Sequence, residues 1–144
     1  MGPDEPLFTA RPPGSWLSMS ATSNHEIATR VAITRHQLGD VPVLEVGGEL
    51  DLWTAPELCA RIEACLDASD QGVVIDLAPL QFCDSTGLRA LAGAATEARV
   101  AANRLVMLRP TSQGVCRAFE LAGAAEFLPL VDDVDQARKL LMAS

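Results

Sequence analysis

The pattern of apolar and polar positions along the chain predicts strands and helices in alternation. Two β-branched stretches, over 27–38 and 41–50, flank the turn signal Gly39-Asp40 and predict a β-hairpin. The run Gly72–Leu77 is apolar apart from one acid, which is typical of a strand buried on both faces. Elsewhere apolar residues repeat at helical spacing. The predicted order is strand, strand, helix, strand, helix, strand, helix, strand, helix, with the later elements over 54–68, 73–77, 88–102, 104–108, 112–123, 127–131 and 132–139.

This alternation predicts an α/β fold, because strands and helices that follow each other in turn pack as layers. We expect a single domain over 27–144, with a mixed β-sheet of about four to five strands and about four α-helices packed on it. The later strands should be joined by right-handed crossovers. Residues 1–26 are interrupted by Pro and Gly and predict a flexible N-terminal tail, although Trp16 or Leu17 provides apolar groups that would allow docking.

Helix ends and helix faces can also be predicted. Thr54 and Glu57 have the spacing of a capping box, with Pro56 in the first turn, where its missing N–H is harmless. We expect the second helix to bury one stripe and to leave small alanines on its other faces. The predicted stripe is Leu88, Leu91, Ala92 and Ala95, the other alanines are Ala90, Ala94, Ala98 and Ala101, and the third helix should bury Val115, Cys116, Phe119 and Leu121.

The segment Phe82–Leu88 joins the central strand to the second helix and has two interpretations. Asp84 and Ser85 are favoured helix N-caps, because their side-chain oxygens accept free backbone N–H groups. A serine at a helix N-terminus is also a good place for a phosphate, since the N–H groups and the helix dipole favour negative charge there.

Composition and charge narrow the function classes. The chain has 144 residues, is 49% hydrophobic and carries a formal net charge of −8, which is typical of a soluble globular protein and argues against nucleic acid as the main partner. No apolar run is long enough to span a bilayer and no signal peptide is visible, so we expect a cytoplasmic protein without a membrane partner. Cysteines in that compartment are usually reduced thiols.

The sequence contains few residues that could serve as catalytic groups. The only histidines are His25 and His36, there is no tyrosine, and Ser85 lacks the Gly-x that precedes a nucleophile elbow. No C-x-x-C pair and no glycine-rich phosphate loop is present. We therefore expect no catalytic residues, no metal site and no cofactor.

Several motifs in order resemble the STAS domain, and within it the bacterial anti-sigma factor antagonists. The resemblance spans about Val31 to Leu141, and its most specific parts are the Gly-Glu-Leu-Asp and Asp-Ser-Thr-Gly-Leu segments. The motifs that carry it are Gly48-Glu49-Leu50-Asp51, Thr54-Ala55-Pro56, Val74-Ile75-Asp76-Leu77, Phe82, Asp84-Ser85-Thr86-Gly87-Leu88 and Leu121-Ala122-Gly123.

The resemblance implies a phosphorylation switch. In the antagonists the serine after the aspartate is phosphorylated by an anti-sigma factor that is also a serine kinase, and a PP2C-type phosphatase removes the phosphate. The unphosphorylated form binds the anti-sigma factor and frees the sigma factor. By position, Ser85 is the phosphoacceptor here. We expect a monomer or weak dimer whose partner contacts Asp51, Trp53, Asp84, Thr86, Gly87 and Arg89. The alternative is a STAS adaptor in a lipid-transport or signalling assembly, in which Ser85 is only a helix cap.

Three side chains near the segment Phe82–Leu88 can each be interpreted in two ways. Arg89 departs from many relatives, which carry a small residue there, and is either a solvated surface residue or a contact to the phosphate or the kinase. Trp53 is either an anchor for the partner or a lid over the core. Cys83 is either a plain thiol or a group whose oxidation is coupled to partner binding. Cys65 and Cys116 fit core positions, and Cys59 flanks the first helix stripe.

Overall fold

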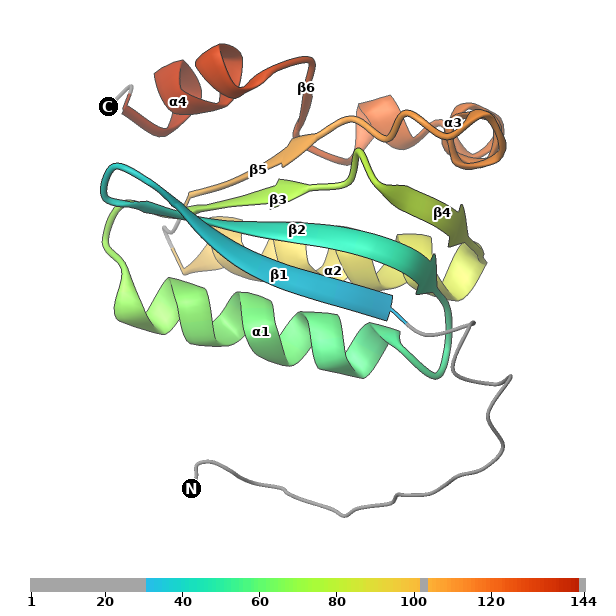
Figure 1. Ribbon diagram of the computed structural model, residues 1–144, viewed down its shortest axis with the longest axis horizontal. Coiled ribbons are helices and arrows are strands. Elements are labelled where there is room, and N and C mark those ends of the chain that lie inside the picture. Colours follow the sequence, from blue (N-terminus) through green and yellow to red (C-terminus); the bar gives the residue numbers. More distant parts are fainter. Residues whose placement is uncertain (1–30, 102–103, 143–144) are drawn as a thin grey trace. The chain divides into compact units, whose positions relative to one another are not determined.

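The computed structural model describes residues 31–101 and 104–142, which form six strands and four α-helices (Figure 1). The elements follow in the order β1 (Val31–Leu38), β2 (Val41–Leu50), α1 (Ala55–Ala68), β3 (Val73–Asp76), β4 (Leu80–Cys83), α2 (Ser85–Val100), β5 (Leu105–Leu108), α3 (Gln113–Ala122), the short 3-10 helix η3 (Ala124–Glu126), β6 (Leu130–Val131) and α4 (Val134–Met142). The predicted α/β class is confirmed. The predicted tail over 1–26, with Trp16 and Leu17, and residues 27–30 of the predicted first strand lie outside the described residues.

The sheet is mixed, and its strands lie in the order β1-β2-β3-β5-β6, with β4 also paired to β2. β1 and β2 form the predicted antiparallel hairpin, whose turn uses Gly39 at a positive φ of 63° that favours glycine. All other pairings are parallel. The carboxyl ends of β2, β3, β4 and β5 therefore meet at one edge of the sheet, where α/β proteins usually place their sites.

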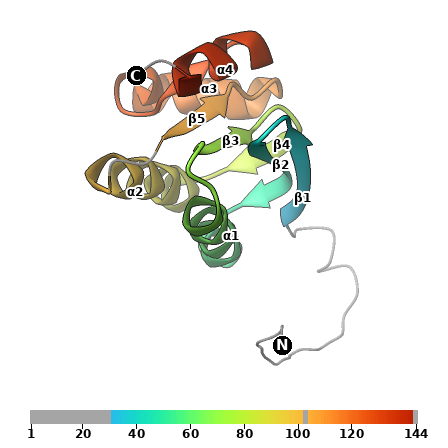
Figure 2. The same cartoon turned by 90° about the vertical axis from the view of Figure 1, so that its left-hand side faces the viewer.

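Helices cover both faces of the central strands (Figures 1 and 2). Val73 and Ile75 of β3 belong to the larger core cluster, together with the buried residues of α1 and α2. Val74 points to the opposite face and packs with residues of α4. Burial on both faces is what the apolar run of β3 predicted. Each fully buried Leu or Ile contributes roughly 1.5–3 kcal/mol of transfer free energy to this core.

Strand β4 was not predicted as a strand. β3 ends in a turn in which the backbone N–H of Ala78 donates to the Asp76 carboxylate at 3.0 Å. The chain then runs parallel to the last residues of β2, with Leu50 opposite Cys83. Four residues carry too little periodicity to indicate a strand. The pairing with β2 makes this segment a strand, and the sheet has six strands where four or five were expected.

The helix faces differ from prediction in detail. In α2, Ala94 and Ala98, expected on the outer faces, are buried, and Ala92 is only half-buried. The helix begins at Ser85, where the cap candidates Asp84 and Ser85 indicated its start, almost a turn before the apolar pattern that begins at Leu88. In α3 only Val115 and Phe119 are buried, whereas Cys116 is half-buried and Leu121 is 77% exposed. The face of α3 that packs inward is therefore narrower than the apolar pattern indicated.

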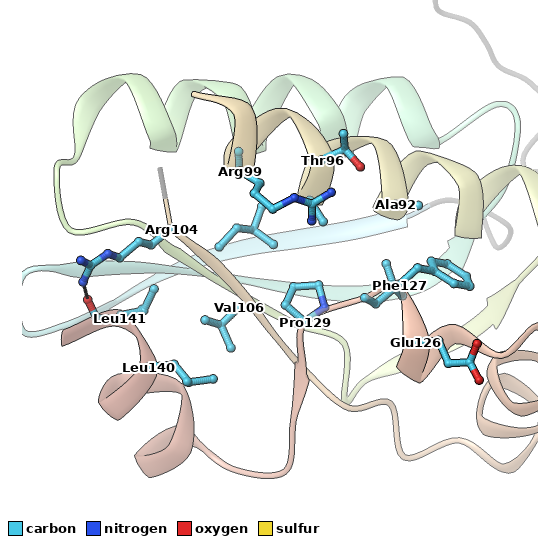
Figure 3. Close-up of a pocket in the computed structure, with 14 residues that line it drawn as sticks. Ala92, Thr96, Arg99, Arg104, Val106, Glu126, Phe127, Pro129, Leu140 and Leu141 are labelled. Carbon is cyan, nitrogen blue, oxygen red and sulfur yellow. Dashed lines mark hydrogen bonds between the residues drawn. The ribbon is translucent and has the colours of Figure 1, made fainter. Parts of the chain in front are cut away.

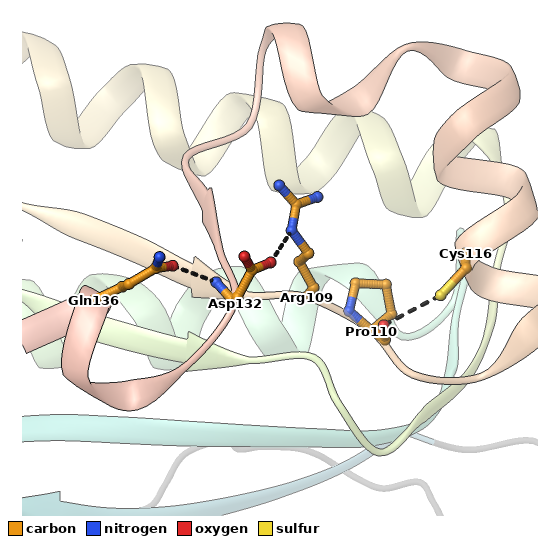
Figure 4. A network of polar contacts seen from close by, with 5 residues as sticks. All are labelled: Arg109, Pro110, Cys116, Asp132 and Gln136. Atoms are coloured by element: carbon orange, nitrogen blue, oxygen red, sulfur yellow. Dashed lines mark hydrogen bonds and ion pairs between the residues drawn. The ribbon is translucent and has the colours of Figure 1, made fainter.

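Polar contacts hold the segments around β5 and β6 together (Figure 4). The Nε of Arg109 lies 2.7 Å from Oδ1 of Asp132, and the backbone N–H of Asp132 donates to the Gln136 side chain. The thiol of Cys116 donates to the carbonyl of Pro110 at 3.2 Å, which places this cysteine at the start of α3 and not in the core. The exposed ion pair between Arg109 and Asp132 contributes at most about 1 kcal/mol to the free energy of folding, so it mainly orients the loops.

Candidate functional site

The two most specific motifs meet where β2 and β4 end side by side. Leu50 pairs with Cys83 in the sheet, and the backbone N–H of Asp84 donates to the carbonyl of Leu50 at 3.2 Å. The connector after β2 and the N-terminus of α2 are thereby neighbours at the carboxyl edge of the sheet. Segments that are far apart in the sequence thus form one surface.

Gly87 allows this close approach. A Cβ atom at this position would lie 2.6 Å from the carbonyl oxygen of Leu50 and 3.0 Å from the sulfur of Cys83. The first distance is shorter than real Cβ contacts and the second is tight, so glycine lets the first turn of α2 pack on the end of β2 without displacing the Leu50 backbone. Gly87, expected among the partner contacts, is buried, and its observed role is this packing.

The cap of α2 is Asp84. Its Oδ1 accepts the backbone N–H of Gly87 at 2.9 Å, and its own backbone is extended, as N-cap residues are. Ser85 is the first residue of the helix and is exposed. Of the two helix-cap candidates, the aspartate therefore makes the capping hydrogen bond, and the Ser85 hydroxyl stands at a helix N-terminus that favours anions.

The connector after β2 is a turn held by side-chain hydrogen bonds. Oδ1 of Asp51 accepts the backbone N–H groups of Trp53 at 2.9 Å and of Thr54 at 3.1 Å. The buried Thr54 hydroxyl accepts the N–H of Asp51 at 2.9 Å and donates to the carbonyl of Glu49 at 2.8 Å. The predicted capping box is wrong, because Thr54 makes no side-chain cap hydrogen bond to α1. Its hydroxyl instead ties the connector back to β2.

This turn directs two large apolar side chains into solvent. Trp53 is 85% exposed and Leu52 is 60% exposed. The interpretation of Trp53 as a lid over the core is therefore wrong. Holding a tryptophan in solvent on an ordered turn forgoes the free energy that its burial would contribute. Tryptophan is over-represented among the residues that contribute most to binding at protein interfaces, so the exposed Trp53 is the candidate anchor of this site.

The remaining predicted contacts lie on the first two turns of α2. Thr86 is half-buried, and Arg89 is exposed about one helical turn after Ser85. No ion pair between described residues includes Arg89. The guanidinium is therefore open to solvent beside the serine.

Cys83 lies under the site and is not suited to redox chemistry. Burial, and to a smaller extent the negative charge of Asp84, raises the pKa of its thiol to about 12. The reactive form of a cysteine is the thiolate, so this side chain is protonated and shielded at neutral pH. These properties argue against the oxidation switch considered from the sequence. All four cysteines are free thiols.

Two further findings concern metal ions and membranes, and both apply to the described ranges, 31–101 and 104–142. No three His, Cys, Asp or Glu side chains in them are grouped so as to hold a metal ion. No helix in them is long and apolar enough to cross a membrane.

The sequence over most of the chain matches a known family. The sequence model described as "Mlab, STAS domain" matches residues 33–132. The chain therefore belongs to the STAS domain family. A comparison with curated protein sequences gave no match.

The fold of the domain is similar to that of solved anti-sigma factor antagonists. It is similar to an anti-sigma factor antagonist from Mycobacterium paratuberculosis, at 27% identity and a TM-score of 0.66, over 78% of this chain and 95% of that one. It is also similar to the antagonist SpoIIAA in its unphosphorylated form, at 19% identity and a TM-score of 0.61, over 78% and 99% of the two chains. The Bacillus SpoIIAA in the phosphorylated form matches at 19% identity and a TM-score of 0.55, over 76% and 99%. At 19% identity the SpoIIAA structures establish the fold alone.

Proposed function

We propose that this protein is an anti-sigma factor antagonist that is switched by phosphorylation of Ser85. The unphosphorylated form binds an anti-sigma factor with serine kinase activity in the cytoplasm and releases the sigma factor. Phosphorylation by that partner ends the interaction, and a PP2C-type phosphatase restores the binding form. In this scheme the chain is the substrate of the kinase and not itself an enzyme.

The observation that carries the proposal is the position of Ser85. Its hydroxyl is exposed at the first residue of α2, while the capping hydrogen bond comes from Asp84. A serine that also served as the cap would lose a structural hydrogen bond on modification. Here a kinase can reach and modify the hydroxyl without removing the cap.

The switch has a simple electrostatic basis. A phosphate adds about −1.5 to −2 charges at neutral pH, and the free N–H groups of the first turn of α2 favour an anion. The domain should therefore tolerate the phosphate. A docked partner should not, because Asp84 and Asp51 already make this edge negative, and a buried like charge costs several kcal/mol. A loss of about 3 kcal/mol weakens binding roughly 150-fold.

The surface on which the partner docks follows from the connector geometry. Trp53 and Leu52 project from a turn that is fixed by the hydrogen bonds of Asp51 and Thr54. This turn adjoins the N-terminus of α2, so one partner can cover both Ser85 and Trp53. Arg89, exposed on the same helix, is placed to contact either the kinase or the phosphate.

A phosphorylation assay tests the proposal. The full chain, incubated with the anti-sigma kinase of its own organism and Mg-ATP, should gain one phosphate, which mass spectrometry should place on Ser85. Ser85→Ala should bind the kinase and accept no phosphate, whereas the control Thr86→Ala should still be phosphorylated. A phosphate on Thr86 in the wild-type chain would show that the assignment is wrong.

The second candidate is a STAS adaptor that is not phosphorylated. It is favoured by the family model, whose description names Mlab and not the antagonists. Binding of the purified protein to the anti-sigma factor distinguishes the two candidates. If Ser85→Asp and true phosphoserine at this position both bind as tightly as wild type, the switch is refuted and the adaptor replaces it.

A further inference from the structure

A concave site lies along α2, away from Ser85. A cavity of about 630 Å³ is lined by the C-terminal half of α2, the start of β5, the segment 126–129 and the end of α4 (Figure 3). Thr96, on its wall, is about 16 Å along the helix axis from Ser85, at the usual rise of an α-helix. The cavity is therefore separate in space from the site at Ser85.

The short strand β6 explains why the space exists. β6 has two residues and pairs only with Met107 and Leu108 of β5. The first half of β5, Leu105 and Val106, has no neighbouring strand on that side within the described sheet. Pro129 precedes β6 and has no N–H with which to extend the pairing. The sheet edge is consequently open between the layer of α2 and the layer of α4.

The walls of this cavity are mainly apolar. Ala92 and Ala95 of α2 face the strand residues Leu105 and Val106 across it, and Leu128 lies beside them. Phe127 and Leu140, which also line the cavity, are 43% and 54% exposed. Exposed apolar groups around a hollow of this size are typical of a small-molecule site.

Three charged side chains line the cavity, and they differ in the contacts that they make. The guanidinium of Arg104 donates to the carbonyl of Leu141 and so caps the end of α4. Glu126 lies at the other end, and Figure 3 shows its carboxylate directed away from Arg99. Arg99 lies along α2 at the rim, is exposed, and is in no ion pair between described residues. One guanidinium is therefore open to a ligand.

We infer that this cavity binds a fatty acid, with its carboxylate on Arg99 and its acyl chain against the apolar walls. A guanidinium and a carboxylate form two parallel charge-assisted hydrogen bonds, which gives the head group a fixed place. The half-buried Ala92 and the exposed Phe127 and Leu140 provide apolar groups against which an acyl chain can pack. The opposite charges of ligand and rim select an anion over a neutral chain of the same length.

Decanoate below its micelle concentration is a suitable probe. Titration into the ¹⁵N-labelled full chain, followed by amide chemical shifts, should give saturable shifts at Ala92, Ala95, Leu105 and Leu128. Arg99→Gln should raise the Kd at least tenfold. Decanol, which has the same chain and no charge, should also bind at least tenfold more weakly than decanoate.

Two controls keep the result unambiguous. Arg89→Gln removes another exposed arginine of α2 and should leave the Kd within twofold of wild type. Ala92→Met fills the cavity and should abolish binding, with circular dichroism to verify folding; if it does not fold, the two arginine variants decide. Absence of saturable shifts, equal weakening by both arginine variants, or equal affinity for decanol and decanoate would each overturn the inference.

Discussion

Two glycines of the same helix should respond in opposite ways to replacement by alanine. At Gly87 a Cβ would lie 2.6 Å from the carbonyl oxygen of Leu50, which also accepts the backbone N–H of Asp84 at 3.2 Å. At Gly93 a Cβ would meet no atom within 4 Å, because the residue faces solvent. The two substitutions are chemically identical and differ only in their surroundings.

The magnitudes follow from that difference. Forcing a methyl group into a packed site costs about 1–3 kcal/mol. Separating α2 from β2 also weakens a backbone hydrogen bond, which contributes about 0.5–1.5 kcal/mol. We therefore expect Gly87→Ala to lower the free energy of unfolding by about 2–4 kcal/mol, less a fraction of 1 kcal/mol for the better helix propensity of alanine. Gly93→Ala has only the propensity gain and should raise the free energy of unfolding by about 0.5–1 kcal/mol.

Urea denaturation followed by far-ultraviolet circular dichroism measures both changes on the full chain. Equal slopes for the three proteins would show that the changes concern stability and not compactness. The reasoning is refuted if Gly87→Ala is as stable as wild type, or if both variants shift the midpoint in the same direction. The first result would mean that the packing of α2 on β2 does not require glycine at position 87.

Further predictions concern the connector and the buried thiol. Trp53→Ala should change the free energy of unfolding by less than about 0.5 kcal/mol, since the side chain is 85% exposed. It should weaken binding of the anti-sigma factor, measured by calorimetry, by more than about 2 kcal/mol; a loss of stability with unchanged binding would contradict the anchor role. Thr54→Val should cost about 1–3 kcal/mol of stability in the same urea assay, because it leaves the carbonyl of Glu49 and the N–H of Asp51 without their hydroxyl partner; an unchanged midpoint would contradict this. The pKa of Cys83 rises from its ordinary 9.0 to about 12 through burial and, second, the charge of Asp84. Between these values the unfolded thiol ionises while the folded thiol does not, so stability should fall as pH rises above 9. Cys83→Ala should remove that part of the slope, and identical slopes would disprove it.

Local patterns in the sequence are enough to predict most of the elements. The β-branched runs around Gly39-Asp40 form the expected hairpin, and the apolar run forms β3, a strand covered on both faces, over 73–76. These elements can be predicted because side-chain period and turn chemistry act over a few residues. The motif around Ser85 likewise indicates a helix start, since the preference of aspartate for the cap position is local. The fold class and the position of the candidate serine therefore follow from local patterns alone.

Other features depend on contacts between distant segments. Leu80–Cys83 is a strand only because it lies along the end of β2, after a register shift between Gly48 and Glu49. The sequence shows that Thr54 is able to cap a helix, but the nearby carbonyl of Glu49 and N–H of Asp51 decide that its hydroxyl bonds backward.

Trp53 shows most clearly the difference between what local sequence predicts and what tertiary contacts decide. A tryptophan in a connector fits the core and a partner surface equally well, because its hydrophobicity is the same in both places. The carboxylate of Asp51 fixes the direction of the turn, and the turn directs the ring into solvent. The sequence by itself determines most of the elements, though not β4, and where the serine lies in the chain. The tertiary structure alone decides which side chains surround it, because that depends on how β2, β4 and α2 come together in space.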